Sequence, residues 1–156
     1  MRVRTRRHRR HLLPLQLPIY FEQELGGWLF EPMANGTLKD ADFQVAFCES
    51  ILARTPDHAE ALALLGEAYT ARGEIEKGLQ TDLHLSRLKP CSGIVHYNLA
   101  CSYALLGRKD EALRTLRRAL ELGYSDREHL CNDTDLQSLR DDPRYQALIE
   151  EWPAGK

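Results

Sequence analysis

The chain repeats itself with one fixed period, which is about 34 residues long. Four pairs of identical residues carry this period: Leu65 and Leu99, Tyr69 and Tyr103, Gly73 and Gly107, and Pro56 and Pro90. Self-similarity of this length is typical of solenoids built from helix pairs, in which each unit buries its apolar face only by stacking on the next unit. The period therefore predicts an all-α fold and favours a binding scaffold.

Each period contains two amphipathic helices. Their apolar residues in the first copy are Leu62, Leu65, Ala68 and Tyr69, then Ile75, Leu79, Leu83 and Leu88. Residues at these spacings share one face of a helix. We expect Asp57 to cap the first helix, with Glu60 completing a capping box. Gly73 is expected to end this helix, and Pro90 to stop the second, because proline lacks an amide hydrogen.

The second copy follows the same order. Ser92 is expected to cap its first helix, which carries Leu99, Ala100, Tyr103 and Leu106 and ends at Gly107. Its second helix carries Ala112, Leu113, Leu116, Ala119 and Leu120 and ends at Gly123.

These two copies resemble the tetratricopeptide repeat family, whose motif places Trp, Leu-Gly, Tyr, Ala, Phe and Pro at set offsets within a period of the same length. Matching residues are Leu62, Leu65, Gly66, Tyr69 and Pro90 in the first copy, and Leu99, Ala100, Tyr103, Ala112, Leu116 and Ala119 in the second. Gly78 replaces the small Ala and Asp82 the aromatic residue, while Tyr124 stands in place of Pro. Asp82 suggests less regular packing of its helix. The resemblance implies a right-handed superhelix of helix-turn-helix units.

The flanking segments divide the rest of the chain. Residues 1–18 are expected to be a basic, disordered arm, and residues 19–56 an irregular segment plus a degenerate repeat that ends at Thr55-Pro56. Residues 57–124 hold the two repeats. Residues 125–156 are expected to form a helical cap, with Asp142 capping a helix that begins at Pro143. The run from Asp126 to Glu151 also resembles the closing module that follows the last repeat in bacterial proteins of this family.

The amino-terminal arm polarises the charge of the chain. It contains Arg2, Arg4, Arg6, Arg7, Arg9 and Arg10, and no acidic residue precedes Glu22. Removing these six arginines from the 21 basic residues leaves 15 against 23 acidic residues, a net charge of about −8. Such an arm could bind nucleic acid or an anionic membrane, or serve as a targeting segment. No aromatic residue lies among the arginines, which disfavours nucleic-acid binding.

The resemblance also implies where a ligand would bind. In this family the first helix of each pair lines a concave groove. Carried onto this chain, the groove positions are Glu60, Ala63, Glu67, Thr70, Ile94, Tyr97, Cys101 and Leu105. We expect Tyr97 to form an exposed apolar cluster with Ile94 and Leu105, and the acidic end near Glu67 to favour a ligand with a basic residue beside a hydrophobic anchor.

The sequence carries no pattern typical of a catalytic centre. It lacks a Gly-x-Ser-x-Gly elbow, a phosphate-binding glycine loop and a His-Glu-x-x-His helix, so we expect no enzyme activity and no cofactor. Cys48, Cys91, Cys101 and Cys131 form no Cys-x-x-Cys pair and are expected to be free thiols rather than metal ligands.

Together these patterns predict a noncatalytic scaffold or adaptor that binds a protein or peptide in its groove. A self-associating repeat module, and a protein that binds nucleic acid or anionic membrane through its arm, remain alternatives. No apolar run is long enough to cross a bilayer, since Pro14 and Pro18 interrupt the most apolar stretch. We therefore expect a cytoplasmic protein.

Overall fold

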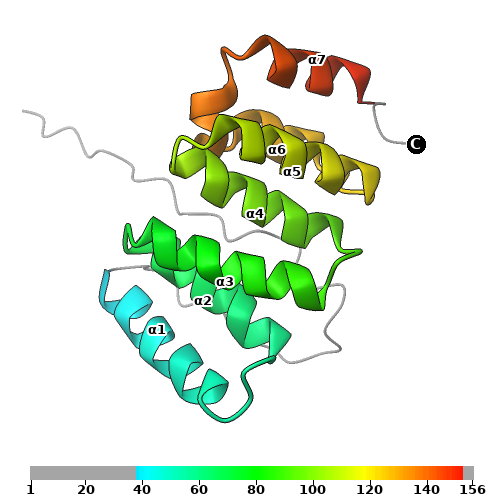
Figure 1. The fold of residues 1–156 in the computed structure, drawn as a ribbon. Coiled ribbons are helices and arrows are strands. Elements are labelled where there is room, and N and C mark those ends of the chain that lie inside the picture. The colour runs from blue at the N-terminus through cyan, green and yellow to red at the C-terminus, as the bar shows by residue number, and fades with distance from the viewer. Residues whose placement is uncertain (1–37, 153–156) are drawn as a thin grey trace, which may run out of the picture. The chain divides into compact units, whose positions relative to one another are not determined.

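The computed structural model describes residues 38–152, and these fold into successive helical hairpins (Figure 1). The predicted basic arm, the irregular segment as far as residue 37 and the last four residues lie outside the described residues. The helices are α1 (Leu38–Leu52), α2 (Ala59–Ala71), α3 (Ile75–Leu88), α4 (Gly93–Leu105), α5 (Lys109–Glu121), α6 (Arg127–Asn132), the 3-10 helix η2 (Thr134–Leu139) and α7 (Pro143–Glu151). Each of α1 to α4 packs against the helix that follows it. The described residues therefore form the predicted repeat solenoid.

Three glycines end helices where the sequence predicts. Gly73, Gly107 and Gly123 have φ angles of +75°, +71° and +93° and follow α2, α4 and α5. A side chain disfavours this left-handed conformation, whereas glycine adopts it freely. No heavy atom lies within 4 Å of a Cβ built on these residues, so the backbone angle alone explains the glycines.

The cap of α2 differs from the prediction. His58 occupies the cap position, and its Nδ1 accepts a hydrogen bond from the Ala61 amide at 3.2 Å. Asp57 lies one residue too early and instead pairs with Nε2 of His84 on α3, at 2.8 Å. The predicted cap at Asp142 is confirmed, because its carboxylate accepts the Arg144 amide at 2.9 Å and Pro143 begins α7.

The core lies between consecutive helices. Its largest cluster joins α4 and α5 to the carboxyl-terminal segment, where Leu116, Leu130, Leu136 and Leu139 are fully buried. Smaller clusters join α1 to α2, and α2 to α3 and α4. No helix within residues 38–152 is both long and apolar enough to cross a membrane.

Asp82 is accommodated on α3 by a polar contact. The helix is continuous, and Asp82 is only 6% exposed. Its Oδ2 accepts a hydrogen bond of 2.5 Å from the hydroxyl of Ser102 on α4. Room for the carboxyl comes from Gly66 on α2, where an added Cβ would lie 2.7 Å from Oδ1 of Asp82. A polar contact and a missing side chain thus replace the aromatic packing expected at this position.

Candidate functional site

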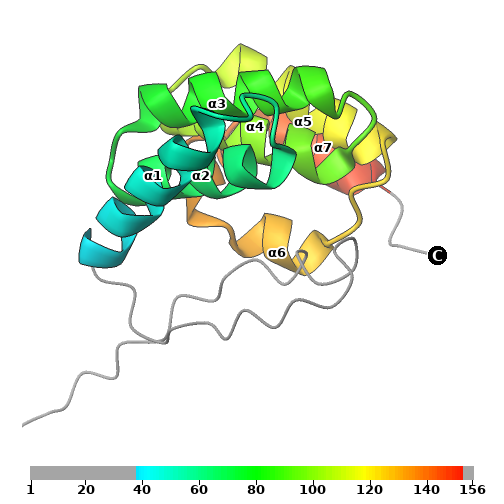
Figure 2. The ribbon, with the colours of Figure 1, turned by 90° about the horizontal axis from the view of Figure 1, so that it is seen from below.

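The predicted ligand surface is the face formed by α2 and α4, which we call the inner face. Figure 2 shows α6 on this side of the stack, with α3 and α5 on the other. Helices α2 and α4 begin one period apart, so Ala63 and Tyr97, and Glu67 and Cys101, hold equivalent positions. Tyr97 and Cys101 both contact Asp133, which follows α6. The shared period predicts that Ala63 and Glu67 lie on the corresponding face of α2.

The two halves of the inner face differ in accessibility. On α2, the side chains of Glu60, Ala63, Glu67 and Thr70 are partly exposed. On α4, Ile94 is partly exposed and packs against the core, Leu105 is 37% exposed, and Tyr97 and Cys101 are buried. Among the described residues, the α2 half is therefore partly exposed, whereas the centre of the α4 half is covered.

The expected exposure of Tyr97 is wrong, because Tyr124, His129 of α6 and Asp133 lie against its side chain. Tyr97 is 2% exposed, and its ring stacks on Tyr124 with centroids 4.1 Å apart and planes at 7°. Its hydroxyl donates a hydrogen bond of 2.5 Å to Oδ2 of Asp133. No exposed cluster with Ile94 and Leu105 results.

Asp133 contacts several other polar groups beside Tyr97. Its Oδ2 also accepts from the Cys101 thiol at 3.6 Å and lies 3.7 Å from Nε2 of His129. Its Oδ1 accepts the Asp135 amide at 2.9 Å, which caps η2. Burial, reinforced by the neighbouring carboxylate, raises the pKa of Cys101 well above its ordinary value. The thiol is thus a protonated packing group at neutral pH rather than a nucleophile.

A second polar group, consisting of Glu67 and Asp82, lies in the first repeat. Burial raises the pKa of Glu67 to about 7, and the charge of Asp82 acts in the same direction. Burial also raises the pKa of Asp82, to about 6, although the hydrogen bond from Ser102 opposes this change. Glu67 lies at the predicted acidic end of the inner face, and it changes charge near neutral pH. We call Glu67 and Asp82 the acidic pair.

Sequence reasoning missed the contacts by which Asp133 and Ser138 attach the carboxyl-terminal segment to α4. The Ser138 hydroxyl donates to the carbonyl of Ala104, one period earlier in the chain, at 2.9 Å. The separation of one repeat period between Ala104 and Ser138 is the sequence signal that could have indicated this contact. It was obscured because the apolar pattern of the repeat fades after Tyr124.

The comparisons agree with this geometry. Residues 93–125, which span α4, α5 and the turn after them, match the family model described as tetratricopeptide repeat. The chain contains a tetratricopeptide repeat. Helices α2 and α3 begin one period before α4 and α5, so the first hairpin holds the equivalent place in the preceding copy.

One curated relative is similar over part of its length. This chloroplastic protein from Arabidopsis thaliana is 28% identical over 90 residues, which are 56% of the chain described here. The aligned part is 27% of that relative, so the chain spans about a quarter of the protein that it matches. The predicted cytoplasmic location gains no support from this chloroplast protein.

Metal ligands and thiols are the other reactive groups that the sequence raises, and the cysteines lie within residues 38–152. No cluster of three or more His, Cys, Asp or Glu residues there is arranged to hold a metal ion. All four cysteines are free thiols, with Cys48 and Cys101 buried and Cys91 and Cys131 exposed. What the inner face offers instead is a partly open surface with one titratable acidic group.

Proposed function

We propose that the chain is a noncatalytic protein-interaction module that binds a peptide or helix of a partner protein on the α2 half of the inner face. Tetratricopeptide repeats are in general protein-interaction modules, and residues 93–125 match that family. The α4 half is largely occupied by the chain's own carboxyl-terminal segment. The contact surface proposed therefore runs along Glu60, Ala63, Glu67 and Thr70.

The observation that carries this proposal is the acidic pair. Glu67 is partly exposed and has Asp82 as a charged neighbour, with the pKa of Glu67 raised to about 7. Burial and Asp82 both disfavour the ionised form of Glu67, and no cation within residues 38–152 is found to offset them. A lysine or arginine side chain of a ligand would supply that cation, while Ala63 would accommodate an apolar side chain next to it.

Binding of such a ligand should depend on pH in a defined direction. A cationic side chain favours ionised Glu67, so binding lowers the pKa of Glu67 and releases a proton. Affinity for a labelled peptide with alternating arginine and leucine is expected to rise several-fold between pH 6 and pH 8. Fluorescence anisotropy at constant ionic strength measures this change.

Glu67→Gln is the matching variant, because it keeps the size of the side chain and removes the titration. It should weaken binding at pH 8 and abolish the rise with pH. Glu76→Gln, on the exposed surface of α3, is the control and should bind as the parent does. Equal affinities for the parent and Glu67→Gln at pH 8 would rule out this ligand site.

Self-association is the second candidate, and two exposed phenylalanines of α1 favour it. Phe43 and Phe47 are 70% and 50% exposed, and their rings stack with centroids 6.0 Å apart. Exposed aromatic pairs of this kind are typical of protein interfaces. Sedimentation of the parent and a Phe43→Ser/Phe47→Ser variant tests this directly, since a dimer should dissociate only in the variant.

The roles predicted for the arginine-rich arm concern residues outside the described part of the chain. Binding to nucleic acid or anionic membrane through that arm would show a steep dependence on salt concentration. Binding at the α2 half should instead respond chiefly to Glu67→Gln.

A further inference from the structure

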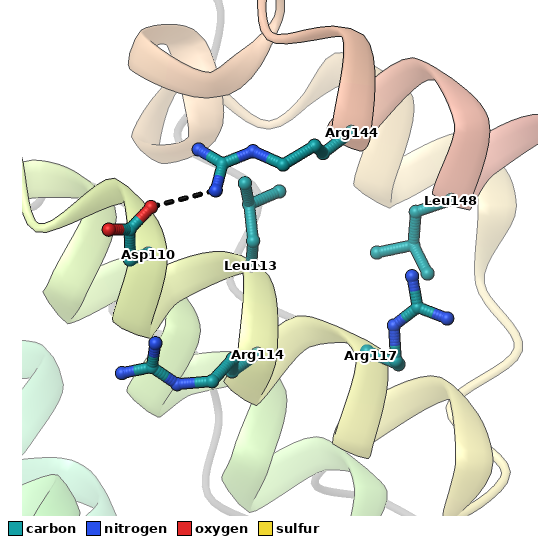
Figure 3. A pocket seen from close by; sticks show the side chains of 6 residues that line it. All are labelled: Asp110, Leu113, Arg114, Arg117, Arg144 and Leu148. Atoms are coloured by element: carbon teal, nitrogen blue, oxygen red, sulfur yellow. Dashed lines mark hydrogen bonds and ion pairs between the residues drawn. The ribbon is translucent and has the colours of Figure 1, made fainter.

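A groove of about 450 Å³ lies between α5 and α7, and its rim carries three arginines. Arg114 and Arg117 come from α5 and Arg144 from α7, while Leu113 and Leu148 lie between them (Figure 3). Figure 3 shows Arg117 directed from α5 toward Leu148, and Arg144 reaching across to Asp110. We call this feature the arginine groove.

The three guanidinium groups are not equivalent. Arg144 is held in place, because it forms ion pairs of 2.8 Å with both Asp110 and Asp142. Arg114 and Arg117 are exposed and form no ion pair or hydrogen bond with any other side chain of residues 38–152. Arg114 and Arg117 lie one helical turn apart on α5 and border the groove, and Figure 3 shows Arg114 directed to the side of Asp110 and Arg117 toward Leu148.

Of the two complete repeats, only the second carries arginine at these two positions. The positions equivalent to Arg114 and Arg117 in the first copy are Gln80 and Leu83 on α3, one period earlier. The stacking of repeats therefore does not require arginine at these places. A guanidinium group presents a planar set of donors that matches a carboxylate, and it can bind both carboxylate oxygens at once.

We propose that the arginine groove is a docking site for an acidic peptide segment of a protein partner. Carboxylates on one side of the segment would pair with Arg114 and Arg117, and an apolar side chain between them would lie over Leu113 and Leu148. The two leucines are 8% and 6% exposed, so they present only their edges and charge pairing dominates recognition.

Charge around the groove favours a short peptide over an extended polyanion. Asp110 lines the groove itself, and Glu150 and Glu151 are exposed at the end of α7. A nucleic acid or a membrane surface covers a wide area and gains affinity by contacting many basic residues at once. Here such a surface would also approach Glu150 and Glu151, whereas a short segment in the groove meets only Asp110, whose charge is paired with Arg144.

This site lies on different helices from the proposed inner-face site and has the opposite charge. The two proposals therefore make separable predictions. A chain with both sites could hold a basic segment near Glu67 and an acidic segment at the arginine groove, and so connect two partners.

The test measures binding of a fluorescein-labelled peptide of alternating glutamates and leucines to the full chain, by anisotropy at 0.15 M salt. An Arg114→Gln/Arg117→Gln variant is expected to bind at least about tenfold more weakly. An Arg87→Gln/Arg118→Gln variant is the matched control, because it removes the same charge from exposed positions on α3 and α5. This control should bind like the parent.

Three further measurements distinguish the arginine groove from other binding surfaces. A peptide with glutamine in place of glutamate should not bind, and amide shifts on adding the acidic peptide should map to α5 and α7. Glu67→Gln should leave acidic-peptide binding unchanged, which separates this site from the inner face. Equal affinity of both double variants would overturn the proposal and assign binding to the basic arm, as would binding to anionic vesicles with none to the peptide.

Discussion

The buried carboxyl of Asp82 makes the stability of the first repeat depend on pH. Its pKa is about 6 in the folded chain, against an ordinary value of 3.8, because burial disfavours the charge. The folded state thus binds the proton more tightly than the unfolded state. The resulting stabilisation is fully present below about pH 4 and is lost as the pH rises through 6.

Asp82→Asn should therefore flatten this dependence. The amide keeps an oxygen to accept from Ser102 but cannot ionise. The parent should lose the stabilisation due to Asp82 between about pH 4 and pH 6, and the variant should be more stable than the parent at pH 8, by on the order of 2 kcal/mol. Urea unfolding at several pH values measures both. Parallel curves for the two proteins would contradict the assigned ionisation.

Gly66 is small because Asp82 occupies the space beside it. An alanine Cβ at Gly66 would lie 2.7 Å from Oδ1 of Asp82, so Gly66→Ala should destabilise the parent by about 1–3 kcal/mol. In an Asp82→Ala background the clash is gone. The same substitution should then stabilise α2 by about 0.5–1 kcal/mol, because alanine favours helix over glycine. A double-mutant cycle from thermal unfolding checks this change of sign; the same sign in both backgrounds would refute it.

At the scale of elements, helix order and most helix ends could be predicted from the sequence. Glycines with positive φ and the Asp142-Pro143 cap act through local backbone geometry, so their positions alone are informative. The partners of Tyr97 and Asp82 could not be predicted in this way. Each depends on a side chain far away in the sequence that forms a specific polar contact, Asp133 and Ser102 respectively.

The attachment of the α6–η2 segment to α4 gives a prediction at this scale. Tyr97→Phe removes the hydroxyl that bonds Asp133 and leaves the ring stack in place. Loss of one hydrogen bond to a charged group should cost about 1–3 kcal/mol and speed amide exchange in residues 127–139.

Tyr103→Phe provides the control for that experiment. The Tyr103 ring packs under the guanidinium of Arg108, and its hydroxyl has no hydrogen bond to any of residues 38–152. Exchange in residues 127–139 should then match the parent. Equal exchange rates in Tyr97→Phe and Tyr103→Phe would show that the hydroxyl does not hold the segment.

At the scale of the whole described region, the period of the repeat extends further than the sequence pattern indicates. Helices α6 and α7 begin one period after α4 and α5, and Arg144 pairs with Asp110 at the same spacing. The copy is interrupted at Asp133, whose extended backbone separates α6 from η2. The periodicity was hidden because Gln137 and Asp141 replace the Tyr and Gly of the earlier copies.

This third, broken copy should be required for folding, since it closes the apolar end of the stack. Leu130, Leu136 and Leu139 are fully buried and pack in one cluster with Tyr97 and Leu116. Burying each leucine contributes about 1.5–3 kcal/mol, and their sum approaches the entire stability of a small domain. Deleting residues 126–156 should therefore abolish or strongly lower the cooperative thermal transition, as followed by circular dichroism. Deleting only residues 153–156 is the control and should leave the transition intact. A truncated chain that melts like the parent would show that the two complete hairpins are stable without their cap.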